Sequence, residues 1–404
     1  MQHTTPREAA ALLAINGIFW FALSLGGIFL QVFLFTLGGF RAVVEYNLVS
    51  ACFVVVFYII SGWLLGRIAS KNLLLLGVGA YILLFLLLFL FREQSLALLI
   101  PLGALNGIAM GTFWAAMNLL QYIFTTDEMR HAFFGRQNFL LSVTGGIAPI
   151  LGGVIISLAG TLFSKEFGYS LVFFLVVLLM AAVYGKARKL VVHEPMDFSV
   201  RDVSGHKRSR LWKLVLAQEV FYGIFDFMFS AFAAVIIFLI VKEEFVLGAV
   251  NASGAIIAAV AALAASAALA KKHTSFIAAS AVAAVGIGLF AGEQNWWGLL
   301  ALTFLFNAAM PILNVATAKT FFDIVDRSGG HWQKKYHLFL EREMALGIGR
   351  IASLLLFFLL VNDKNQYDIA RRAVGLLALA PLCIGFILYG ITRVMGAGRM
   401  AVAD

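Results

Sequence analysis

Four ionisable side chains lie within long apolar stretches of the second half of the chain: Glu219, Asp226, Glu343 and Arg350. In hydrocarbon each such group costs at least about 2.5–3.5 kcal/mol on insertion scales, so it faces a cavity or an opposite charge. The chemistry open to them is proton binding, ion pairing or the binding of a charged ligand. We take the three carboxylates as proton-coupling candidates and the guanidinium as a substrate-binding candidate.

The spacing of these residues places them on two helical faces. Glu219, Tyr222 and Asp226 are three and four residues apart and share one face. Glu343 and Arg350 are seven residues apart and share another. Asp226 and Arg350 both fall near the middle of their stretches, which predicts a buried ion pair. It is either a permanent pair that fixes helix packing, or a switch in which a proton on Asp226 releases Arg350 to bind an anionic group.

Neutral polar side chains recur at near-helical spacing in other apolar stretches. The candidates for shaping a substrate pocket are Asn16, Trp20, Gln31, Asn118, Tyr222, Asn307 and Asn314. Asn307 and Asn314 flank Pro311, which kinks helices and frees backbone carbonyls. Hydrogen bonding between helices is the alternative role for each Asn.

The elements that must position these residues are apolar helices. Hydrophobic residues make up 62% of the chain and charged residues 13%, whereas about a quarter of a soluble domain is charged. A helix of about 20 apolar residues crosses the hydrocarbon core, and open sheet cannot. We therefore expect an all-α integral membrane protein with twelve spans. They are predicted near residues 9–38, 43–65, 73–91, 96–124, 136–160, 168–185, 213–241, 246–270, 275–291, 296–322, 339–361 and 370–392.

The net charge of +9 reflects membrane topology. With a cytoplasmic N-terminus, the inner loops, tails and helix ends hold 22 Lys and Arg residues, and the outer ones hold seven. This asymmetry is the positive-inside rule and predicts that both termini are cytoplasmic. A basic stretch divides the chain, so we expect an N-terminal six-helix bundle at 1–185, a cytoplasmic basic linker at 186–212 and a C-terminal six-helix bundle at 213–404.

The turn after the second span carries Gly62, Arg67 and Lys71 at the spacing of a known signature. In this turn the chain resembles the major facilitator superfamily, and the resemblance extends over nearly all of it. Gly66 stands where the family has Asp, and Ala69 where it has a second Gly. The resemblance implies two pseudo-symmetric six-helix bundles, a central cavity lined by spans 1, 4, 7 and 10, and a role of this turn in gating.

Two further basic residues join the gating candidates. Arg136 and Arg342 stand in corresponding places, at the inner starts of spans 5 and 11. With Gly62, Arg67 and Lys71 they complete the set expected to control opening at the cytoplasmic side.

These features predict a secondary active transporter that moves a small molecule across the cell membrane by alternating access, driven by protons. The expected partners are a small-molecule substrate, the lipid bilayer and protons, and the chain is expected to act as a monomer. We expect no cofactor, no metal, no nucleic-acid partner and no enzymatic activity. The substrate stays open between an amphipathic compound and a carboxylate-bearing metabolite. The alternative function is a non-transporting membrane scaffold or sensor that retains the fold.

Overall fold

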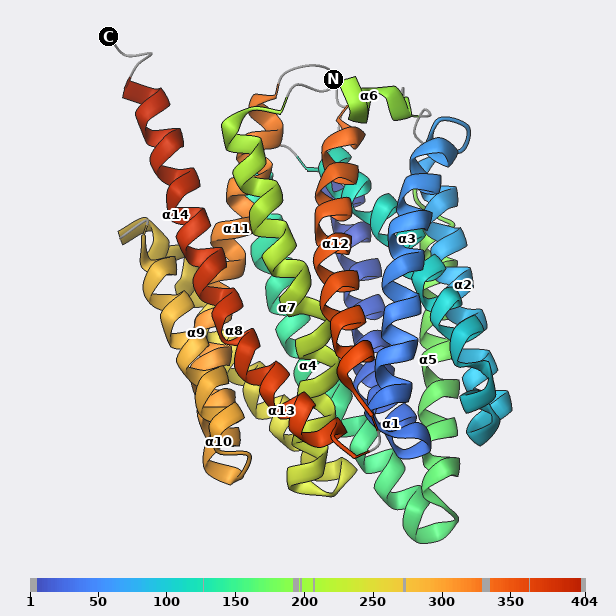
Figure 1. Ribbon diagram of the computed structural model, residues 1–404. Coiled ribbons are helices and arrows are strands. Elements are labelled where there is room, and N and C mark those ends of the chain that lie inside the picture. Colours follow the sequence, from blue (N-terminus) through green and yellow to red (C-terminus); the bar gives the residue numbers. More distant parts are fainter. Residues whose placement is uncertain are drawn as a thin grey trace.

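The protein, seen in a computed structural model, is a bundle of long helices (Figure 1). The structure describes residues 6–125, 127–191, 196, 198–205, 208–271, 274–328, 335–362 and 364–400. Its helices are α1 (Pro6–Leu65), α2 (Ser70–Phe91), the 3₁₀ helix η1 (Arg92–Leu98), α3 (Leu99–Ile123), α4 (Asp127–Leu162), α5 (Lys165–Ala187), α6 (Val200–Gly205), α7 (Arg210–Val241), α8 (Glu244–Lys271), α9 (Ser275–Gly292), α10 (Trp296–Ala301), the π-helical turn η2 (Leu302–Phe306), α11 (Asn307–Arg327), α12 (Tyr336–Leu360), α13 (Gln366–Leu377) and α14 (Leu379–Met400).

Ten helical stretches in the described residues are long and apolar enough to cross a membrane. Two of the ten hold two passes each, because α1 is broken at Gly38 and Gly39 and because η1 separates α2 from α3. The described part of the chain is therefore consistent with the twelve predicted spans, and the predicted all-α class is confirmed.

The break in α1 requires glycine. Gly39 has a φ of +65°, a left-handed conformation that other residues rarely adopt. A side chain there would also meet Gln366 at the start of α13. The neighbouring Phe40 N–H donates to the Gln366 side-chain oxygen at 3.0 Å. The turn between the first two passes is thus tied to the other half of the molecule.

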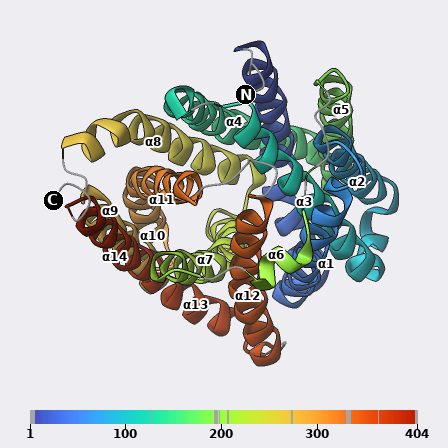
Figure 2. The same cartoon turned by 90° about the horizontal axis from the view of Figure 1, so that it is seen from above.

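The start of α1, the short helix α6 and the end of α14 lie at the same end of the bundle, at the top of Figure 1. We call it the terminal end. α10 and the start of α13 lie at the far end. Seen from above, α2, α3 and α5 lie on one side, and α8, α9, α11 and α14 lie on the other (Figure 2). The predicted division at residues 186–212 is not tested by this arrangement and stays a prediction.

The helices cross closely where glycines face each other. A Cβ at Gly223 on α7 would collide with the carbonyl oxygen of Leu346, and one at Gly349 on α12 with the carbonyl oxygen of Val220. On α4 and α8, Gly153 and Gly248 each face the backbone of the other helix in the same way. Because lipid supplies no hydrophobic drive between helices, such close backbone contact is a main source of their association.

Contacts between α1–α5 and α7–α14 occur at both ends. At the far end, the Lys165 ammonium on α5 lies 3.0 Å from the Glu244 carboxylate on α8. At the terminal end, the Tyr336 hydroxyl on α12 donates to the carbonyl oxygen of Tyr58 on α1 at 3.0 Å. The two tyrosine rings are stacked, with centroids 5.9 Å apart.

The described parts of the segment between α5 and α7 bind both sides of the terminal end. The Met196 N–H donates to the Leu65 carbonyl at 2.8 Å, and the Lys71 ammonium donates to the Leu190 carbonyl at 3.0 Å. Arg208 forms an ion pair of 2.9 Å with Glu341 on α12. The segment is therefore held against the bundle at these points.

The close crossing of α7 and α12 gives a test of the packing. Gly223→Ala should lower the thermal unfolding midpoint of the purified protein, because overpacking of a tight contact costs about 1–3 kcal/mol. Gly390→Ala on α14 is the matched control, since no atom within 4 Å would meet its Cβ. Equal midpoints for the two variants would contradict the described crossing.

Candidate functional site

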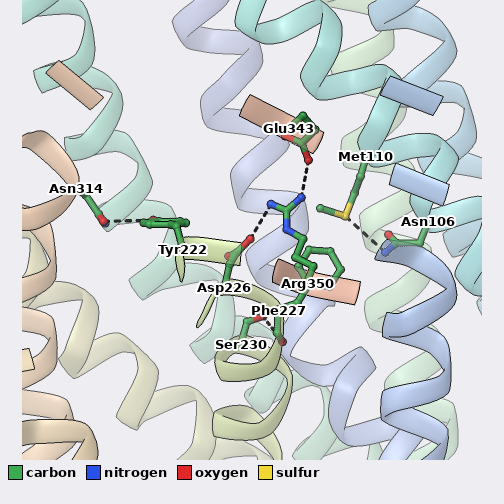
Figure 3. A network of polar contacts seen from close by, with 9 residues as sticks. All are labelled: Asn106, Met110, Tyr222, Asp226, Phe227, Ser230, Asn314, Glu343 and Arg350. Carbon is green, nitrogen blue, oxygen red and sulfur yellow. Dashed lines mark hydrogen bonds and ion pairs between the residues drawn. The ribbon is translucent and has the colours of Figure 1, made fainter. Parts of the chain in front are cut away.

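Arg350 lies at the centre of a buried charge network between α7 and α12 (Figure 3). Its Nη1 donates to Glu343 at 2.5 Å, and its Nη2 donates to Asp226 at 2.9 Å. Its guanidinium carbon lies 4.7 Å from the centroid of the Phe227 ring. The side chain of Arg350 is only 9% exposed. The predicted contact between Asp226 and Arg350 is therefore present, and Glu343 shares the guanidinium.

Local sequence explains how three charges meet in an apolar interior. Glu343 and Arg350 are two turns apart on α12, so their side chains point along the same face. Asp226 comes from α7, which approaches α12 closely because Gly223 and Gly349 lie at the crossing. The neighbouring helix is thus near enough for one carboxylate to reach the guanidinium.

A second ion pair lies nearer the terminal end. Arg342 Nε donates to Glu219 at 3.0 Å, and the Arg342 guanidinium lies over the Phe321 ring at 4.8 Å. The Glu219 side chain is 2% exposed, and its second oxygen, Oε2, has no hydrogen-bond partner in the described residues. Glu219 is seven residues before Asp226 on α7, so the two pairs lie two helical turns apart.

The face of α7 that carries Asp226 is open. The Asp226 side chain is 38% exposed, although its partner Arg350 is buried. One turn away, the Tyr222 hydroxyl is 3.3 Å from the Asn314 side-chain oxygen on α11 and donates to it. Asn314 is itself exposed, and Figure 3 shows the two side chains pointing toward each other. The structure therefore brings Asp226, Tyr222 and Asn314 together at an accessible face.

Asn118 belongs to a different group of contacts. Its amide donates to the Tyr58 hydroxyl at 3.2 Å, and the Tyr58 carbonyl accepts from Tyr336. Tyr58 and Tyr336 were missed by the sequence analysis. A signal existed for one of them, since Tyr336 precedes Glu343 by the same seven residues that separate Glu343 from Arg350. Nothing in the sequence indicated Tyr58.

Two candidates on the first arm of α1 lie against α4. Asn16 and Trp20 line a small cleft together with Gln137. Asn16 is 1% exposed, and neither its amide nitrogen nor its oxygen has a hydrogen-bond partner in the described part of the chain. Trp20 also packs on Trp114 of α3, with ring centroids 5.6 Å apart. The structure does not place Asn16 in contact with the Arg350 network.

Two other candidates make local contacts. The Gln31 side-chain oxygen accepts from Asn47 at 2.8 Å, so it joins the two arms of α1. The Asn307 amide donates to the Thr303 carbonyl at 2.9 Å within its own helical stretch. The Asn307 bond is within one helix, so it is not the interhelical bond weighed as the alternative for each Asn. Whether Gln31 or Asn307 contacts substrate stays a prediction.

The gating candidates lie at the terminal end. Arg67 stacks on Trp63, with the guanidinium carbon 3.6 Å from the ring centroid. A Cβ on Gly62 would collide with the rings of Phe198 and Tyr336, so this glycine permits close contact between the turn and α12. Arg136 is exposed on α4. With Lys71 bound to Leu190 and Arg342 to Glu219, these residues take part in several separate contacts.

Comparison with known proteins places this geometry in a family. The sequence profile described as Major Facilitator Superfamily matches residues 12–331. An uncharacterized protein of Bacillus subtilis, YqgE, is 26% identical over 381 residues, which cover 93% of this chain and 86% of the relative. An uncharacterized protein of Geobacillus stearothermophilus, encoded in the sodM 3′ region, is 33% identical over 181 residues, which cover 45% of this chain and 83% of that protein.

Solved structures share the fold. The fucose:proton symporter of E. coli superposes with a TM-score of 0.64 at 15% identity, covering 96% of this chain and 99% of that one. A structure described in work on proton dependent oligopeptide transporters superposes with a TM-score of 0.71 at 15% identity, covering 97% of this chain and 100% of that one. At this identity the likeness establishes the architecture alone.

The Arg350 network gives a stability prediction. Arg350→Met should destabilise the protein by about 3–5 kcal/mol, because it leaves the buried Glu343 and the partly exposed Asp226 without their counter-charge. The double variant Arg350→Met/Glu343→Gln should recover part of that loss, since it removes one of the stranded charges. Thermal unfolding of the purified variants measures both effects, and Arg372→Met on the exposed face of α13 is the control. A double variant no more stable than Arg350→Met would contradict the network.

Proposed function

The chain belongs to the Major Facilitator Superfamily, and from that premise we propose that it is a proton-coupled secondary active transporter of a small molecule in the cell membrane. The observation that carries the proposal is the contact of Arg350 with Glu343 and Asp226 near the middle of two apolar helices. Ionisable groups at such a depth mark substrate or proton pathways by default.

Asp226 is the first choice for the coupling carboxylate. It is the most exposed member of the network, so a proton reaches it more readily than it reaches Glu343 or Glu219. A proton on Asp226 removes the charge that holds it to Arg350, while Glu343 still neutralises the guanidinium. Arg350 thus acts as an internal counter-ion, and protonation loosens α7 from α12. Glu219 is the second choice, because one of its oxygens has no hydrogen-bond partner within the described residues.

Alternating access supplies a role for the contacts at the two ends. Opening the far end requires separation of Lys165 from Glu244, and opening the terminal end requires separation of Tyr336 from Tyr58. The second step is controlled by the gating candidates, Gly62, Arg67, Lys71, Arg136 and Arg342. Two six-helix bundles, 1–185 and 213–404, move against each other around the Asp226 face.

The substrate pocket in this proposal lies beside that face. Tyr222 and Asn314 form its wall on the second half, and Asn118 and Trp20 contribute from α3 and α1. The terminal end faces the cytoplasm, in agreement with the excess of Lys and Arg predicted there. The alternative, a non-transporting scaffold or sensor, is favoured by Gly66, which replaces the acidic residue of the family's gating turn.

Proton-driven flux in liposomes tests the transport proposal. The purified protein, reconstituted with an imposed pH gradient and a panel of metabolites and drugs, should change the internal pH when a substrate is added. Asp226→Asn should reduce the coupled flux at least about tenfold, because an amide side chain cannot bind the coupling proton. A tenfold loss corresponds to about 1.4 kcal/mol in the barrier to transport. Asp368→Asn, which removes an exposed carboxylate on α13, should retain it. Flux that is never coupled to protons across the panel would favour the scaffold.

The proposed orientation has its own test. In a background with Cys52 and Cys383 replaced by Ser, we expect Glu293→Cys at the far end to react with a membrane-impermeant maleimide in intact cells. Asn72→Cys near the terminal end should react only after the membrane is broken. Both original residues are exposed. The opposite labelling pattern would overturn the orientation.

A further inference from the structure

We propose that the charge network between α7 and α12 recognises an organic cation, such as a protonated amine or a quaternary ammonium or phosphonium group, and rejects anions. This inference names the substrate class of the proposed transporter and rests on that proposed function. It also decides between the two substrate classes that the sequence left open, since a carboxylate-bearing metabolite would need a free cationic partner.

The network carries excess negative charge. Within the residues that the structure describes, its three ion pairs join three carboxylates and two guanidiniums: Glu219, Asp226 and Glu343 against Arg342 and Arg350. The pairs are joined through the adjacent residues Arg342 and Glu343. With every group ionised, the sum is three negative and two positive charges, a net of −1. In an apolar interior this imbalance attracts a cation and repels an anion.

The guanidinium of Arg350 has little capacity left for an anion. Both terminal nitrogens already donate to carboxylates of the protein, and the Phe227 ring covers one face of the guanidinium. Its Nε is buried and has no hydrogen-bond partner among the described residues, so it offers a single donor without an open approach. An anionic substrate would have to displace Asp226 or Glu343 and would add a second uncompensated negative charge.

The carboxylates, in contrast, have free capacity. Asp226 is 38% exposed and is held to Arg350 through one oxygen, Oδ2. Glu219 is 2% exposed and its Oε2 has no hydrogen-bond partner in the described chain. A buried and unpaired carboxylate oxygen is costly unless a proton or another positive group reaches it. The accessible binding capacity of the network is therefore at the exposed carboxylate of Asp226.

A cluster of aromatic rings includes residues within one helical turn of Asp226 on α7. Phe229, one turn beyond Asp226 on α7, lies 4.8 Å from Phe225 and 4.7 Å from Phe306, measured between ring centroids. Ring faces attract cations, most strongly where water is excluded. A carboxylate within one helical turn of an aromatic cluster, on the same face of α7 as Tyr222, matches the chemistry of a lipophilic organic cation.

Matched probes of opposite charge test this inference on the purified full-length protein. The cations are tetramethylammonium, 2-phenylethylammonium and tetraphenylphosphonium, and their counterparts are acetate, 3-phenylpropionate and tetraphenylborate. At least one cation should raise the thermal unfolding midpoint by about 2 °C or more, and its anionic counterpart should not.

Asp226→Asn should abolish the shift, and Glu219→Gln should reduce it by about half or more, since each cancels the excess charge. Asp368→Asn removes an exposed carboxylate elsewhere and should leave the shift intact.

The outcomes separate this inference from the transport proposal. A larger shift with an anion, no shift with any of the three cations, or a cation shift that survives Asp226→Asn overturns the inference, and proton-coupled flux of another substrate would leave the transport proposal standing. A cation shift that requires Asp226, without transport of that cation in proteoliposomes, supports the inference and counts against the proposed function. The Glu219→Gln variant keeps the test decisive if Asp226→Asn fails to fold.

Discussion

Arg350 carries a permanent positive charge near the middle of α12, where the neighbouring residues of the helix are almost all apolar. A charge in that position needs counter-charges within hydrogen-bonding distance. Glu343 on the same helical face supplies one, and Asp226 on α7 supplies the other. That requirement fixes the rotation of α12 about its axis and the rotation of α7 toward it. It also sets how near the two helices must be, and glycines at their crossing make that distance reachable.

The same crossing connects the network to the closing contacts of the bundle. α12 begins with Tyr336, which binds the backbone of α1, and two turns later it carries Glu343. α7 begins beside the described residues of the segment that crosses the terminal end, where Trp212 and Arg208 both bind Glu341 of α12. A change in charge at Asp226 therefore acts on two helices that also make contacts at the terminal end. No separate mechanical element between the charge network and that end is required.

The sequence predicted the parts of this arrangement that depend on periodicity and depth. The apolar runs gave the helices, and equal depth predicted the contact between Asp226 and Arg350, which is confirmed. Seven-residue spacing placed Glu343 and Arg350 on one face. The contacts between Tyr58 and Tyr336, and between Lys165 and Glu244, were not predictable in this way. They depend on how helices far apart in the chain are rotated and paired, and spacing within one helix carries no information on that. Asn16 shows the same limit, because its position along α1 could be read but not that it would face α4.

The distribution of charge argues for a division of labour between the two halves. A buried ion network adds little stability compared with apolar side chains of the same volume, so packing alone does not account for five charged groups between α7 and α12. The described contacts of α1–α5 near that depth are instead neutral, as in the bond between Asn118 and Tyr58 and the packing of Trp20 on Trp114. Breaking a hydrogen bond between neutral groups costs less free energy than breaking a buried ion pair when two helix faces separate. In the proposed transporter, the first half is thus suited to form and release contacts, while the second half holds the buried charges.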